Sequence, residues 1–121
     1  MRNIIASGDF YAVPSCFDAL SAKLIEQAGF ELTFMSGFAA SASRIGAPDL
    51  GLMTYSEVLD QARNITDAIS IPLMADGDTG YGNAMNTRRT VAGFIKAGCA
   101  AVLIEDQLAP KRCGHTKGKD V

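Results

Sequence analysis

The chain has 121 residues, of which 48% are hydrophobic and 20% charged, and its formal net charge is −2. This length fits one domain with a core of its own and is too short for two. The 11 basic residues against 13 acidic ones exclude a nucleic-acid-binding surface rich in positive charge, and no apolar run approaches the roughly 18 residues that span a bilayer. We therefore expect a soluble globular protein with neither a nucleic-acid nor a membrane partner.

The cysteines and the N-terminus bear on the cellular compartment. Cys16, Cys99 and Cys113 are an odd number at wide spacings, which fits neither a disulfide framework nor a zinc site. The first ten residues contain no continuous apolar stretch of the kind found in secretory signals. We expect a cytoplasmic protein in which at least one thiol is free to react.

Short apolar runs alternate with helix-period segments from the start of the chain. Residues 11–16 are predicted to form a first strand and residues 31–35 a second. Between them, Asp18 is predicted to cap a helix that stops at Gly29. The segment 37–53 is rich in Gly, Ala and Ser and is predicted to be a loop. The first helix is expected to face the core through Leu20, Leu24, Ile25 and Ala28.

The same alternation continues through the second half of the chain. Thr54 and Glu57 have the spacing of a capping box, in which each side chain bonds the backbone of the other. Residues 71–75 are predicted to form the third strand and residues 100–104 the fourth. The helix stripes expected to face the core are Val58, Ala62, Ile65 and Ala68, and then Val91, Phe94 and Ile95 in a helix from Asn83 to Gly98. Residues 107–121 are predicted to be a polar loop.

Strands that alternate with helices predict an α/β fold with a buried parallel sheet. A doubly wound sheet and a barrel are both compatible with this pattern. No Gly-x-Gly-x-x-Gly follows the first strand, so the main sign of a dinucleotide-binding fold is missing. Half a barrel would have two open strand edges, and no helix follows the fourth strand. We therefore expect a fragment of a larger domain.

Carboxylates follow two neighbouring strands of the predicted sheet. Asp76 and Asp78 come after the third strand, and Glu105 and Asp106 after the fourth. The carboxyl ends of parallel strands meet on one face, so these side chains should converge, and a cation should offset their repulsion. A cluster of oxygen donors without histidine or thiolate favours Mg²⁺, with Mn²⁺ as the alternative. The simpler reading of Asp-Gly-Asp-Thr-Gly is an ordinary turn.

Two further segments have residues suited to binding or catalysis. Successive N–H groups of Ser36, Gly37 and Phe38, after the second strand, could hold a carboxylate or phosphonate, although a plain glycine turn explains them equally well. Cys113 has Lys111, Arg112 and His115 as neighbours, a positive setting typical of reactive cysteines. The other interpretation is a solvated basic loop, which fits Lys117 and Lys119. A single histidine excludes a histidine-rich metal site.

Taken together, these motifs resemble the isocitrate lyase and phosphoenolpyruvate mutase family, over essentially the whole chain. Members of this family are (β/α)8 barrels of more than twice this length, usually tetramers. The resemblance therefore implies the N-terminal half of such a TIM-type barrel, strands 1–4, within a homotetramer. The motifs, in order, are Ser36-Gly37, Pro48-Asp49-Leu50-Gly51, Asp76-Gly77-Asp78-Thr79-Gly80-Tyr81-Gly82-Asn83, Ile104-Glu105-Asp106-Gln107 and Lys111-Arg112-Cys113-Gly114-His115.

The resemblance also implies roles for individual residues. Asp76 is expected to bind magnesium directly, and Asp78 and Glu105 mostly through water. Asp49 is expected to lie near the metal or the substrate. The substrate carboxylate is assigned to Ser36, Gly37 and Phe38. On a gating loop formed by residues 107–121, Cys113 is expected to be the catalytic thiol, with Lys111 and His115 supporting it.

The cysteine loop is similar to that of the 2-methylisocitrate lyase branch, whereas phosphonomutases typically have Asn-Ser at Cys113 and Gly114. We expect retro-aldol cleavage of a small 2-hydroxy di- or tricarboxylate such as 2-methylisocitrate or dimethylmalate, with Cys113 as proton donor. Phosphonomutase chemistry of the carboxyvinyl-carboxyphosphonate or phosphoenolpyruvate type, and decarboxylation or hydrolysis of oxaloacetate, are alternatives on the same scaffold. A third possibility is a truncated chain that is inactive and aggregates alone.

Overall fold

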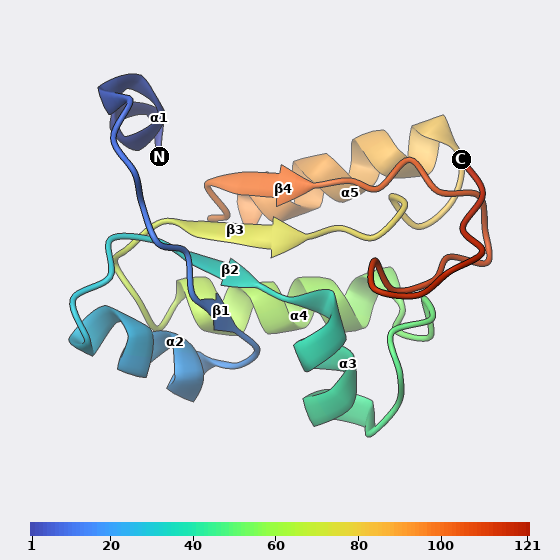
Figure 1. Cartoon of the computed structure of the whole chain (residues 1–121), viewed down its shortest axis with the longest axis horizontal. Helices are drawn as coiled ribbons and strands as arrows, with labels where there is room; N and C mark the ends of the chain where they lie inside the picture. The colour runs from blue at the N-terminus through green and yellow to red at the C-terminus, as the bar shows by residue number, and fades with distance from the viewer.

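The computed structural model describes all 121 residues and contains one four-stranded parallel sheet (Figure 1). The strands lie in the order β1-β2-β3-β4, so each strand pairs with the next one along the chain. A doubly wound sheet would reverse its strand order at a switch point, and this sheet has no reversal. The order is that of one half of a (β/α) barrel, as predicted. The strands are β1 (Ser15–Cys16), β2 (Thr33–Met35), β3 (Leu73–Asp76) and β4 (Ala101–Leu103).

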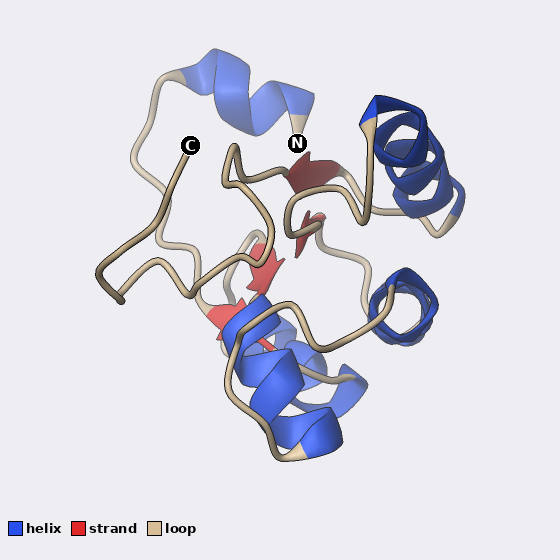
Figure 2. Ribbon diagram, turned by 90° about the vertical axis from the view of Figure 1, so that its right-hand side faces the viewer, coloured by secondary structure: helices blue, strands red, loops and turns tan.

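Five helices accompany the sheet: α1 (Arg2–Ser7), α2 (Ala19–Gln27), α3 (Gly37–Ile45), α4 (Tyr55–Thr66) and α5 (Ala84–Lys96). Of these, α2, α4 and α5 pack against strands and against one another, and they gather along one side of the strand row in Figure 2. The core lies between that helix layer and the sheet. Its largest fully buried apolar side chains are Phe94, Met35, Ile65 and Leu73. None of the helices has the length and apolarity needed to cross a bilayer.

The predicted helix starts are confirmed at all three positions. Asp18 caps α2, where its Oδ1 accepts a hydrogen bond from the Ser21 N–H at 2.7 Å. Thr54 and Glu57 form the expected capping box at the start of α4. Asn83 caps α5. These short polar side chains satisfy N–H groups that have no partner within the helix, which explains why each helix begins where it does.

The prediction of a loop from residue 37 to 53 is wrong in its first half, because residues 37–45 form α3. Ser36 caps this helix by accepting a hydrogen bond from the Ala39 N–H at 3.3 Å, and Gly46 ends it in the left-handed conformation. The glycine and serine content suggested a loop, but Ser36 and Gly46 stand at the two ends of the helix as caps, and Ser41 and Ser43 lie within it, where their hydroxyls donate to backbone carbonyls. Helix α1 was not predicted, and each strand is shorter than its predicted run.

Part of the predicted core stripe is also wrong. Leu20 and Leu24 of α2 are 67% and 57% exposed, and Ile95 of α5 is 64% exposed. Helix α2 packs through the face that carries Ala22 and Ile25, because the small side chain of Ala22 lets the helix approach the sheet closely. The larger leucines consequently point outward from the helix layer.

Candidate metal centre and substrate pocket

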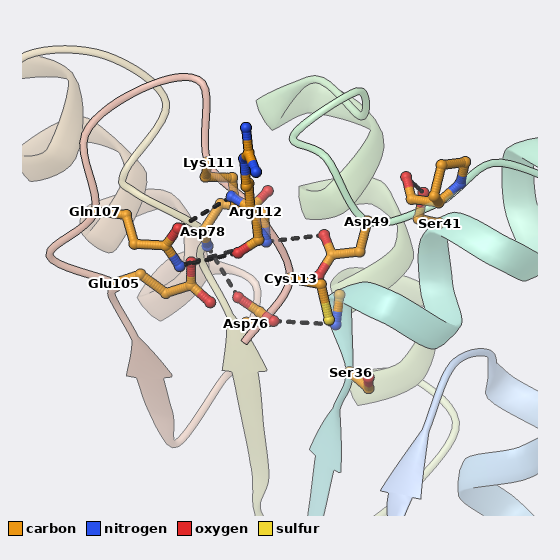
Figure 3. A network of polar contacts seen from close by, with 12 residues as sticks. Ser36, Ser41, Asp49, Asp76, Asp78, Glu105, Gln107, Lys111, Arg112 and Cys113 are labelled. Atoms are coloured by element: carbon orange, nitrogen blue, oxygen red, sulfur yellow. Dashed lines mark hydrogen bonds and ion pairs between the residues drawn. The ribbon is translucent and has the colours of Figure 1, made fainter. Parts of the chain in front are cut away.

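Asp76 is the last residue of β3, and the backbone around it fixes its carboxylate. The Gly37 N–H at the start of α3 donates to Oδ2 at 3.1 Å, and the Asp78 N–H donates to Oδ1 at 3.0 Å (Figure 3). Asp76 is buried, and that burial raises the pKa of its carboxyl, with a further contribution from the neighbouring Asp78 charge. A buried carboxylate whose two oxygens are held by N–H groups is well ordered, and a cation would lower the cost of its charge.

Asp78 and Asp49 face the same positive group. The Lys111 ammonium contacts Oδ1 of Asp49 at 2.8 Å and also forms an ion pair with Asp78. Figure 3 shows Lys111 between these two carboxylates. Its side chain is only 3% exposed. Burial alone would lower the pKa of Lys111, but the contacts with Asp49 and Asp78 outweigh that effect and raise it, so the lysine stays charged.

Glu105 lies two residues beyond β4 and completes the group. Its N–H donates to the Asp78 carbonyl at 2.8 Å, which ties the two strand ends together. Its Oε2 accepts a hydrogen bond from the Gln107 side chain at 2.8 Å and lies 3.9 Å from Lys111 Nζ. Burial raises the pKa of Glu105, and Lys111 partly opposes that shift. Asp106 is exposed, and no ion pair or hydrogen bond joins it to the group.

Asp76, Asp78 and Glu105 lie in one region at the ends of β3 and β4, with Asp49 beside them and the ammonium of Lys111 among them. No three of these side chains come close enough together to enclose an ion directly. The buried Oδ1 of Asp78 faces Lys111 without a regular hydrogen bond. The donors are all oxygens, which are the ligands that Mg²⁺ prefers. Metal binding by Asp76, Asp78 and Glu105 stays a prediction.

The predicted catalytic residues of the loop lie in two different places, a cavity and the acidic cluster. Cys113 lines a cavity of about 430 Å³, and its Sγ lies 3.6 Å from Nδ1 of His115. Lys111, which was predicted to support that thiol, instead points away into the carboxylates. The cavity is lined by Ser36, Phe38, Pro48, Asp49, Leu50, Cys113, His115 and Thr116. Asp49 thus belongs to both the cavity wall and the acidic cluster.

Of the three residues predicted to bind the substrate carboxylate, two line this cavity. Ser36 and Phe38 face it, and the Phe38 side chain is 56% exposed. The Gly37 N–H donates to Asp76, as described above. A Cβ at Gly37 would lie 2.6 Å from Asp76 Oδ2, so glycine is needed for this close approach. The observed contact of Gly37 is therefore with the acidic cluster.

Gln107, which had no predicted role, joins the loop of residues 107–121 to the end of β4. Its Nε2 donates to Glu105 and, at 3.0 Å, to the Arg112 carbonyl, while its Oε1 accepts from the Arg112 N–H at 3.0 Å. One amide side chain thus joins the end of β4 to the segment that carries Lys111 and Cys113. In the sequence, this role is indicated only by a glutamine two residues after the strand-end carboxylate, and glutamines are common in polar loops.

Comparisons with known proteins identify the family of this chain. A family model described as phosphoenolpyruvate phosphomutase matches residues 1–120. The chain is 51% identical over 121 residues to the chloroplastic carboxyvinyl-carboxyphosphonate phosphorylmutase of Arabidopsis thaliana, covering 99% of this chain and 36% of that protein. It is 42% identical to 2,3-dimethylmalate lyase of Eubacterium barkeri, covering 100% of this chain and 42% of the lyase.

A solved structure of a phosphonopyruvate hydrolase in complex with oxalate and Mg²⁺ superimposes with a TM-score of 0.86 and 41% sequence identity. The match covers 91% of this chain and 38% of the hydrolase. The chain therefore spans about two fifths of the length of the proteins that it matches.

Proposed function

The chain belongs to the phosphoenolpyruvate mutase and isocitrate lyase family, and from that membership we propose that the complete protein is a magnesium-dependent carbon–carbon lyase. The proposed substrate is a small 2-hydroxy di- or tricarboxylate of the 2-methylisocitrate or dimethylmalate kind. The observation that carries the proposal is the position of Asp49. This residue belongs to the acidic cluster at two strand ends, and it also lines the cavity that contains Cys113 and His115.

Asp76, Asp78 and Glu105 would hold the ion, and Asp49 would lie between it and the substrate. Bound there, Mg²⁺ would supply Lewis-acid polarisation of a substrate oxygen. The amide of Gly37 keeps the Asp76 carboxylate oriented, and the hydrogen bonds of Gln107 join the segment that carries Lys111 and Cys113 to the end of β4.

The chain's own acid is Cys113. When the carbon–carbon bond breaks, its electron pair stays on the carbon next to a carboxylate. The hydroxyl oxygen passes its proton to the Asp49 carboxylate on the cavity wall and becomes a carbonyl. The Cys113 thiol, on the cavity wall, then protonates that carbon. His115, with Nδ1 at 3.6 Å from Sγ, is placed to return a proton to the sulfur.

The test is turnover by the complete protein, because a chain that spans two fifths of its relatives is proposed to be inactive alone. Incubation with 2-methylisocitrate or 2,3-dimethylmalate should release a 2-oxo acid in the presence of Mg²⁺ and not in the presence of a chelator. Release that is insensitive to the chelator, or no release from either compound, would contradict the proposal. A homotetramer in the cytoplasm belongs to the same proposal.

A second candidate, phosphonomutase chemistry, is favoured by the 51% identity to the phosphorylmutase. Against it stands the Cys113-Gly114 pair in place of Asn-Ser. Phosphorus NMR of a mixture with phosphonopyruvate or phosphoenolpyruvate separates the two chemistries. A lyase leaves the phosphorus resonance unchanged, whereas a mutase converts one signal into the other.

A further inference from the structure

Tyr81 lies in the loop after β3, in a backbone conformation that non-glycine residues rarely adopt. Its φ is 61°, and Asp78 in the same loop has a φ of 47°. Such a conformation is strained for a residue with a side chain, and strain of this kind is found most often at functional sites. Here the strained loop turns the Asp78 carboxylate and the Tyr81 ring toward the same interior region.

Packing holds the Tyr81 ring in place. Its centroid lies 5.8 Å from that of Tyr55, which in turn packs edge-on against Phe94 at 6.4 Å. The Arg89 guanidinium lies 5.6 Å from the Tyr55 ring on the far side of this aromatic group. The ring of Tyr81 therefore has little freedom to turn its hydroxyl elsewhere.

The Tyr81 hydroxyl is fully buried and has no hydrogen-bond partner of regular geometry in the protein. It lies within reach of the Asp78 carboxylate, whose Oδ1 is likewise buried without a hydrogen bond of regular geometry. A buried donor beside a buried acceptor indicates that the two groups contact each other.

A small cavity of about 10 Å³ lies in this region, and the residues that line it include Gly37, Asp49, Asp76, Asp78 and Tyr81. The Tyr81 hydroxyl and Asp78 Oδ1 themselves have almost no surface that a water molecule could touch. The contact between these two groups is therefore direct, with no water between them.

We propose that Tyr81 is a positioning residue of the metal site, whose hydroxyl donates directly to the Asp78 carboxylate. The inference rests on the proposed function, since it concerns the ion that Asp78 would help to hold. Hydrogen bonds of this kind fix the orientation of a ligating carboxylate before the ion arrives. Tyr81 itself touches neither the substrate nor the ion.

The test is ion affinity in the complete protein, measured by Mn²⁺ titration with paramagnetic resonance. Tyr81→Phe keeps the ring and its stacking and removes only the hydroxyl. It should weaken Mn²⁺ binding about 10- to 100-fold, the usual effect of removing a partner that orients a metal ligand. Tyr55→Phe is the matched control, because it removes a hydroxyl from the same aromatic group on the side away from the carboxylates, and it should bind Mn²⁺ as the wild type does.

A second measurement separates positioning from folding. Without metal, Tyr81→Phe should unfold within a few degrees of the wild type, because only one neutral donor is lost while Lys111 continues to pair with Asp78. Wild-type Mn²⁺ affinity in Tyr81→Phe would overturn the positioning role and leave the proposed function intact. Equal weakening in both tyrosine variants would also overturn it. A wild-type protein that binds no Mn²⁺ would overturn the metal site itself, and the role of Tyr81 with it.

Discussion

The ammonium of Lys111 lies 2.8 Å from the carboxylate of Asp49, and it is the buried positive charge of the acidic cluster. Lys111 belongs to the loop of residues 107–121, whereas Asp49 follows α3, so this contact joins two loops that are distant in sequence. The positive charge of Lys111 therefore offsets part of the negative charge of the cluster. A movement of the loop would change the charge around the strand ends.

Replacement of Lys111 by methionine should destabilise the protein strongly when no divalent ion is present. It leaves Asp49 and Asp78 buried without a counter-charge, a change that costs about 3–5 kcal/mol in comparable buried pairs. Added Mg²⁺ should recover much of that loss, because it offers the same oxygens another cation. Urea unfolding with and without Mg²⁺ measures both effects. Lys117→Met, at an exposed position of the same loop, is the control, and an equal response of the two variants to Mg²⁺ would contradict the account.

Gly37→Ala should displace the Asp76 carboxylate, because the added Cβ would lie 2.6 Å from Oδ2. We expect a loss of stability of about 1–3 kcal/mol, as for other overpacked sites, together with weaker Mg²⁺ binding. Calorimetric titration and thermal unfolding report the two quantities separately. Ala42→Ser adds one atom to the exposed face of the same helix and should change neither. Wild-type affinity in Gly37→Ala would show that Asp76 does not need this close contact.

The pH dependence follows from the raised pKa values of Asp76 and Glu105. Both groups bind protons more readily in the folded protein than their ordinary pKa values of 3.8 and 4.5 imply. Without metal, the contribution of Asp76 to stability is thus greatest below 3.8 and is lost as the pH rises through its folded-state pKa. Mg²⁺ needs the ionised forms, so its affinity should fall as the pH drops, beginning above 4.5. Titrations across this range check the sign, and affinity that stays constant down to the ordinary values would contradict it.

Cys113→Ser should suppress cleavage by at least about a hundredfold, the usual scale for a residue that transfers a proton, and should leave Mg²⁺ binding unchanged. The thiol lines the cavity and has no contact with the carboxylates. Cys99→Ser is a suitable comparison, because Cys99 packs beside the core and burial raises its pKa to about 11. That variant is expected to keep its turnover per folded molecule. Full activity in Cys113→Ser would remove the thiol from the mechanism.

Much of the architecture could be predicted because it depends on local chemistry. Asp18, Thr54 and Asn83 cap their helices through bonds that span only two or three residues, and a sequence displays such spacings directly. The convergence of Asp76, Asp78 and Glu105 followed from one topological rule about strand ends. The choice between a barrel and a doubly wound sheet did not follow, since strand order is a long-range property.

The errors have a different origin. Helix α3 was missed because glycines and serines are also loop formers, and two of its serines lie inside the helix. Leu20 and Leu24 were assigned to the core because a leucine pair at helical spacing suggests burial, whereas the helix packs through the smaller Ala22. The position of Lys111 was not predictable, because a lysine in a basic loop is usually solvated, and its burial depends on Asp49 and Asp78, which are distant in sequence.

The central claim is that acidic side chains from the ends of β3 and β4 share one divalent ion. It is tested most directly by Mn²⁺ titration of the complete protein alongside Asp76→Asn, Glu105→Gln and the exposed neighbour Asp106→Asn. The account predicts one tightly held ion per chain in the wild type and in Asp106→Asn. It also predicts affinity weakened about tenfold or more in the other two variants, since even the partners of metal ligands have effects of that size. One ion held equally well by all four proteins, or none held by the wild type, would contradict it.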